Sequence, residues 1–164
     1  MRDEKMRQDY GADYASGQAG IPLQRVRFSD IIRRREVRRH TTQHPGNWRQ
    51  VRGSWVRVST IGQTFLDMVE NPTWCGGMAH VLEVWAEHAS IFIEEIITSV
   101  DGASTKLTKV RAGYLLQERL SLAISDSRVE GWKRFAQRGG SQKLDPEGDY
   151  APVFSPTWMI SLNV

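Results

Sequence analysis

The chain has 164 residues, a length typical of one domain that buries its own core. It is 40% hydrophobic and 25% charged, which excludes the disordered and fibrous classes. No apolar run approaches the ~20 residues of a membrane helix, and the N-terminus lacks the apolar core of a signal peptide. The single cysteine, Cys75, excludes an internal disulfide. We therefore expect a cytoplasmic protein with no membrane partner.

The net charge of +3 conceals an uneven distribution. Ten arginines and two acids lie between Arg25 and Arg57, whereas seven acids and no Lys or Arg lie between Val58 and Thr105. Basic residues dominate again from Lys106 to Arg138. Such blocks predict a basic and an acidic surface, and so they concern the partners of the protein more than its fold.

The N-terminal third is predicted to contain a flexible segment followed by strands. Residues 1–20 are polar and without periodicity, so we expect a flexible lead-in before one domain spanning residues 21–164. Alternating residues between Pro22 and Phe28 indicate a strand, and Glu36–Thr42 gives a weaker second signal. The segments on either side of Gly53 predict a hairpin. Together these strands should form a small antiparallel sheet with one apolar and one cationic face.

Helices are predicted from Thr60 onward. Thr60 and Gln63 have the spacing of a capping box, and Asn71-Pro72 should end the helix that it opens. Apolar residues then recur at helical spacing in three further stretches. These run from Met78 to Ile96 with a possible break near Ser90, from about Ser104 to Leu120, and from Ser125 or Asp126 to Gly139-Gly140.

The last segment, from Tyr150 to Leu162, returns to an extended pattern. We expect it to add one or two strands to the N-terminal sheet. The predicted fold is therefore α+β, with a small antiparallel sheet of N-terminal strands plus a C-terminal strand packed against four or five helices.

Three segments resemble one protein family. They are Ser59–Gly77 with its Thr64, Leu66-Asp67, Pro72 and Gly76-Gly77; Arg111-Ala112-Gly113-Tyr114-Leu115-Leu116; and Leu144-Asp145-Pro146 followed by Trp158 and Asn163. In this order they are similar to the C-terminal domain of AbiEi-type antitoxins of bacterial abortive-infection (type IV) toxin–antitoxin systems. The resemblance spans roughly Arg25 to Val164. The family usually has Pro and Glu where this chain has Ile61 and Gly62.

The resemblance implies a non-enzymatic antitoxin that neutralises a nucleotidyltransferase-like toxin, with a possible part in autoregulation of its operon. Family members usually carry an N-terminal winged helix-turn-helix that reads DNA, and residues 1–20 are too short to supply one. Operator-specific repression is therefore not implied, whereas neutralisation and non-specific nucleic-acid contact are.

Arginines form the candidate binding site. Guanidinium groups keep their charge and bind phosphates bidentately, so an arginine-rich sheet face predicts contact with DNA or RNA. Trp48 and Trp55 lie among these arginines and could add stacking. The alternative is a solvated face, or one that pairs with the acidic block of the same chain. The candidate residues are Arg33, Arg34, Arg35, Arg38, Arg39, Arg49 and Arg52.

Other reactive side chains are better explained without a site. His80, Glu83, Glu87 and His88 have permissible metal-ligand spacing but are also ordinary residues of a solvated helix face. Cys75 is expected to be a packed thiol rather than a nucleophile. Asp67 is expected to pair with an arginine of the sheet. We therefore expect no metal and no cofactor.

Two other functions remain open. The chain could be a nucleic-acid-binding accessory domain, or a fragment of a transcriptional regulator, with no toxin partner. It could also be a hydrolase or nuclease, which loss of an activity on substitution of Asp67, His80 or Glu83 would reveal.

Overall fold

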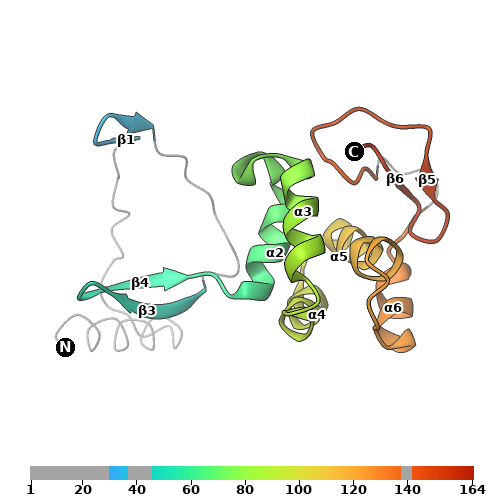
Figure 1. Ribbon diagram of the computed structural model, residues 1–164, viewed down its shortest axis with the longest axis horizontal. Helices are drawn as coiled ribbons and strands as arrows, with labels where there is room; N and C mark the ends of the chain where they lie inside the picture. The colour runs from blue at the N-terminus through green and yellow to red at the C-terminus, as the bar shows by residue number, and fades with distance from the viewer. Residues whose placement is uncertain (1–29, 37–45, 138–141) are drawn as a thin grey trace, which may run out of the picture. The chain divides into compact units, whose positions relative to one another are not determined.

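The computed structural model describes residues 30–36, 46–137 and 142–164 (Figure 1). The chain divides into two compact units, Met1–Thr41 and Thr42–Val164. The expected lead-in and the expected strand after Pro22 lie outside the described residues.

Helix α2 (Ile61–Glu70) begins where the sequence predicts. Its N-cap Thr60 accepts a hydrogen bond from the backbone N–H of Gln63 at 3.2 Å. The side chain of Gln63 donates to Asp67 at 2.8 Å instead of to the cap, so one half of the predicted capping box forms. Phe65, Leu66 and Val69 place one face of the helix in the core.

A short 3-10 helix, η1 (Pro72–Cys75), follows and leads into α3 (Met78–His88). The turn between them needs Gly76 and Gly77, whose φ angles of 90° and 95° lie in the left-handed region. The predicted break near residue 90 is confirmed, because α4 (Ile93–Gly102) is a separate helix.

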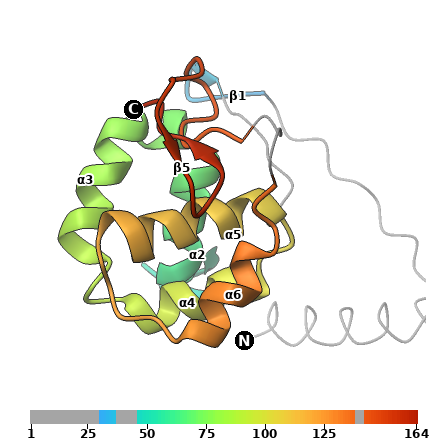
Figure 2. The same ribbon diagram turned by 90° about the vertical axis from the view of Figure 1, so that its right-hand side faces the viewer.

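Helix α2 packs on α4, and Gly62 allows their close approach. A Cβ atom at Gly62 would lie 2.0 Å from the backbone oxygen of Glu95. Helix α5 (Lys106–Gly113) continues into a π-helical segment, η2 (Tyr114–Arg119), and packs against α2 and α6 (Asp126–Lys133), as Figure 2 shows. No helix among the described residues is long and apolar enough to cross a lipid bilayer.

The fold is α+β, as expected, and its sheets among the described residues are three antiparallel pairs of strands. They are β1 (Ile31–Ile32) with β2 (Arg35–Glu36), β3 (Asn47–Val51) with β4 (Ser54–Val58), and β5 (Phe154–Ser155) with β6 (Ile160–Ser161).

Among the described residues β5 and β6 pair only with each other, so the prediction that C-terminal strands extend the N-terminal sheet is wrong for the N-terminal strands β1 to β4. The helices hold this segment. Trp158 is fully buried against Gly113, where an added Cβ would lie 2.2 Å from the indole ring. Asn163 also exchanges two 2.9 Å hydrogen bonds with the backbone of Asp145, which closes the segment on itself. The C-terminal segment therefore completes the helical core.

Candidate nucleic-acid interface

The β3–β4 hairpin carries Arg49 and Arg52 of the candidate site. Its strands pair in register from Asn47 with Val58 to Val51 with Ser54, so the loop has two residues, Arg52 and Gly53. Their φ angles of 48° and 80° are both positive, which defines a type I′ turn. Every residue of both strands is exposed.

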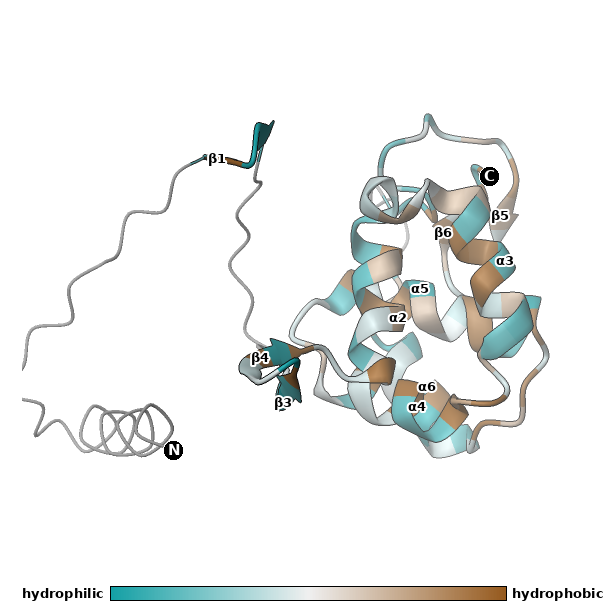
Figure 3. Cartoon of the chain, turned by 60° about the vertical axis from the view of Figure 1, so that its left-hand side comes forward, coloured by the Kyte–Doolittle hydropathy of each residue, from teal (hydrophilic) through white to brown (hydrophobic). Residues whose placement is uncertain are grey.

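The register corrects the expectation of one apolar and one cationic face. Trp48 lies opposite Arg57, and Gln50 lies opposite Trp55, so the two indoles and one guanidinium share a face. Arg49 lies opposite Val56 on the other face. Each face therefore mixes apolar and cationic side chains. Figure 3 shows hydrophilic and hydrophobic residues alternating along the two strands. The sequence prediction did not include the register, and a shift of one residue moves every side chain to the other face.

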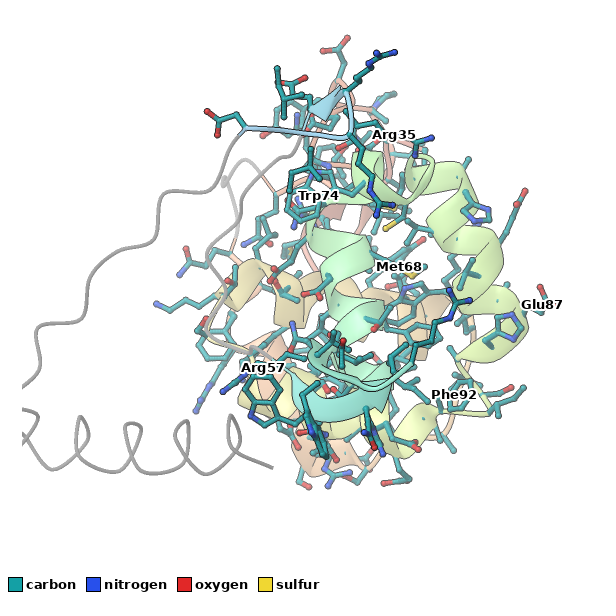
Figure 4. All side chains as sticks on the ribbon, turned by 90° about the vertical axis from the view of Figure 1, so that its left-hand side faces the viewer. Arg35, Arg57, Met68, Trp74, Glu87 and Phe92 are labelled. Atoms are coloured by element: carbon teal, nitrogen blue, oxygen red, sulfur yellow. The ribbon has the colours of Figure 1, made fainter. Side chains whose placement is uncertain are left out.

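We call the side chains of Trp48, Gln50, Trp55 and Arg57 the indole face. The guanidinium carbon of Arg57, labelled in Figure 4, lies 4.6 Å from the ring centroid of Trp48. Trp48 and Trp55 remain 44% and 39% exposed. Arg57 was not among the predicted site residues, although its place opposite Trp48 follows once the two-residue turn is known.

The β3–β4 hairpin contains three arginines and no acid. Neither Arg49 nor Arg52 lies within 4.0 Å of a carboxylate of the described residues. Pairing of these two side chains with the acidic block is therefore not found in the described part of the chain. No carboxylate of residues 30–36, 46–137 or 142–164 neutralises their positive charge.

The β1–β2 hairpin has the same kind of turn. Ile32 pairs with Arg35, so Arg33 and Arg34 form the two-residue loop, with φ angles of 51° and 63°. Both turn side chains are exposed. The predicted site residues Arg38 and Arg39 lie outside the described residues.

Arginine is an unusual choice for these turn positions. Type I′ loops favour Asn-Gly, Asp-Gly and Gly-Gly, because L-residues with longer side chains are disfavoured in the left-handed region by roughly 1–2 kcal/mol. Three of the seven predicted residues, Arg33, Arg34 and Arg52, nevertheless adopt this conformation. Ser121 and Met159 also have positive φ angles, of 51° and 50°, so this conformation by itself does not mark a functional site.

The described residues do not bring the predicted metal-ligand candidates together. His80 lies 3.5 Å from Glu83, and His88 lies 3.6 Å from Glu87, as two separate exposed pairs. No group of three His, Cys, Asp or Glu side chains that could hold a metal ion occurs among the described residues.

The surroundings of Cys75 disfavour its thiolate form. Burial raises the pKa of the Cys75 thiol, and the carboxylate of Asp67 raises it further. A thiol with a raised pKa is a poor nucleophile at neutral pH. The expected partner of Asp67 was an arginine, whereas the hydrogen bonds that the structure shows for it come from Gln63 and Ser59.

The residues that carry the family resemblance have structural roles in this chain. Gly113 makes room for Trp158, and Asn163 is bonded to the backbone of Asp145. The buried side chain of Arg111 donates through Nε to the backbone oxygen of Lys143 at 2.8 Å. These three residues therefore have structural roles, and none of them is among the seven candidate binding residues.

Comparisons of the chain with protein-family models, with curated proteins and with solved structures each gave no match.

Proposed function

We propose that this chain is a non-enzymatic cytoplasmic protein that binds single-stranded DNA or RNA through the β3–β4 hairpin. The observation that carries the proposal is the indole face, where two exposed tryptophans and Arg57 lie together on a hairpin without acids. Exposed aromatic rings beside cations are the usual means of holding a flexible single strand.

Each part of the hairpin has a separate role in this proposal. Trp48 and Trp55 stack on unpaired bases, a contact worth about 1–3 kcal/mol per base. Arg49, Arg52 and Arg57 contact phosphates, and each contact adds about −0.7 to the slope of log affinity against log salt for a single strand. A duplex keeps its bases stacked on one another, so fewer base faces are free to stack on the indole rings.

Binding is tested by fluorescence anisotropy with a labelled twelve-nucleotide strand and with its duplex, each over a salt series. The strand should bind more tightly, and Trp55→Ala should weaken it by about 1–3 kcal/mol. Trp74→Ala is the matched control, because Trp74 is 48% exposed but belongs to η1. The proposal would be contradicted if both variants lost the same affinity for the strand. It would also be contradicted if the affinity did not change with salt concentration.

The antitoxin function is a second proposal. It is supported by the likeness of the three segments named above to AbiEi-type antitoxins, and its partner would be a nucleotidyltransferase-like toxin. Autoregulation of the operon through the arginine-tipped hairpins belongs to the same proposal.

The antitoxin proposal is tested in a culture arrested by expression of the reading frame adjacent to this one. The chain should restore growth. A variant with the arginines of segment 33–39 changed to Ser shows whether neutralisation needs their charge. Binding of nucleic acid without any rescue would favour an accessory domain or a regulator fragment that has no toxin partner.

A further inference from the structure

A second basic cluster lies on the helical core, where α5 begins and α6 ends. Three cations surround the ring of Phe135. The guanidinium carbon of Arg134 lies 4.7 Å from the ring centroid, and the Nζ atoms of Lys106 and Lys109 lie at 5.9 Å and 6.0 Å. We call these four residues the α5–α6 corner. Helices α5 and α6 pack directly on each other, so the corner has a fixed geometry.

Two of the three cations are available to a ligand. Lys106 and Arg134 are exposed, and neither forms an ion pair with a carboxylate of the described residues. Lys109 donates to the backbone oxygen of Asp101 at 2.6 Å and keeps two further N–H groups.

The acids near the corner are occupied elsewhere. The carboxylate of Asp101 accepts from Trp132 and lies 3.4 Å from Arg128. Glu130 pairs with Lys133 at 3.3 Å. The three cations around Phe135 therefore repel one another, and no carboxylate of the described residues forms an ion pair with them, an arrangement that an external anion would stabilise.

The start of α5, which forms part of the corner, lacks the residues that usually stabilise the N-terminus of a helix. The first turn of α5 has no side-chain cap and no acid, and it carries Lys106 and Lys109, although cations are unfavourable at this end of a helix. Glu70 accepts from the hydroxyl of Thr108, but Thr108 is fully buried on the inner side. A phosphate would satisfy both the cations and the first-turn N–H groups, which have no side-chain cap among the described residues.

We infer that the α5–α6 corner binds a phosphate of the nucleic acid, as a contact separate from the hairpin. The inference rests on the proposed nucleic-acid function for the identity of the polymer. The cations and the N–H groups at the start of α5 bind the phosphate. The corner makes no contact with bases and therefore adds no sequence preference.

The experiment compares three variants of the full chain with the labelled twelve-nucleotide strand, over a salt series. Lys106→Gln with Arg134→Gln removes the two free charges and keeps Phe135. Lys133→Gln is the matched control, because Lys133 lies on the same helix end but pairs with Glu130. A hairpin variant carries Arg49→Gln, Arg52→Asn and Arg57→Gln. Circular dichroism confirms that each variant folds.

The corner variant should lose affinity by roughly 25-fold at 0.1 M salt and flatten the salt slope by about 1.4, since each contact with a single strand contributes about 0.7. The Lys133 control should bind as the parent does. If the hairpin variant binds as tightly as the parent and the corner variant does not, the hairpin proposal is refuted and the corner proposal is supported. If the corner variant keeps the affinity and the salt slope of the parent and the hairpin variant does not, the corner proposal is refuted and the hairpin proposal is supported.

A second measurement identifies the source of the phosphate. Inorganic pyrophosphate, added to the ¹⁵N-labelled chain, should shift the backbone amide resonances of residues 106–108. An unlabelled strand should displace the pyrophosphate, so that these resonances move to the positions seen with the strand alone. The corner variant should show no such shift. Shifts that the strand cannot displace would overturn nucleic acid as the ligand.

Discussion

Replacing Arg52 with Asn should make the β3–β4 hairpin more stable and its binding weaker. Arg52 adopts φ 48° at the first position of the type I′ loop, and the variant would have Asn-Gly, the most favoured pair for that loop. An ordinary L-residue is disfavoured there by roughly 1–2 kcal/mol, a cost that Asn largely avoids. We therefore expect a gain of about 1 kcal/mol in hairpin stability.

Amide hydrogen exchange of the β3 and β4 strands measures the first effect. A gain of about 1 kcal/mol should raise protection of these amides roughly fivefold. Anisotropy measures the second effect: loss of one phosphate contact should flatten the salt slope with a single strand by about 0.7.

Arg49→Gln is the control, because Arg49 is an extended residue of the same hairpin. The Arg49→Gln variant should weaken binding to a similar degree. The amides of β3 and β4 should not become better protected from hydrogen exchange in this variant. Unchanged protection in Arg52→Asn would refute the argument from the turn. Unchanged affinity would refute a phosphate contact at the tip.

Two further predictions concern the helical core. Gly113→Ala should destabilise the chain in chemical denaturation by about 1–3 kcal/mol, because its methyl group would overlap the ring of Trp158, whereas Gly131→Ala has open space in α6 and should not destabilise it. The raised pKa of Cys75 should make its alkylation by iodoacetamide at pH 8 slower than that of a free thiol, and Asp67→Asn should accelerate it by removing a charge that raises this pKa. Equal stability of the two glycine variants, or equal alkylation rates with and without the carboxylate, would contradict these arguments.

Local signals predicted most of the helical part. The cap at Thr60 and the break before α4 depend on residues close together in sequence, and both appear at the predicted positions. Pairing of β5 with β6 was not predictable in this way, because it depends on contact of the C-terminal segment with α5. Long-range contacts of this kind leave no periodic pattern in the sequence.

The sequence predicted which residue types make up the candidate nucleic-acid interface. It predicted less well how these residues are arranged on the faces of the hairpin. Arginine content identified the β3–β4 segment, and alternation about Gly53 located the hairpin. The composition of each face followed only from the register, which pairs Trp48 with Arg57. The α5–α6 corner was missed because Lys106 and Arg134 meet through the packing of two helices rather than through proximity in sequence.

The burial of Trp158 against Gly113 has a consequence for biosynthesis. During translation the helices are made first, and the indole that fills the space beside Gly113 is added forty-five positions later (158 minus 113). Until then the nascent protein exposes an apolar gap, so its core is completed only after Trp158 has emerged from the ribosome. Ribosome-bound intermediates that stop before Leu144 should therefore attract chaperones that recognise exposed hydrocarbon surface.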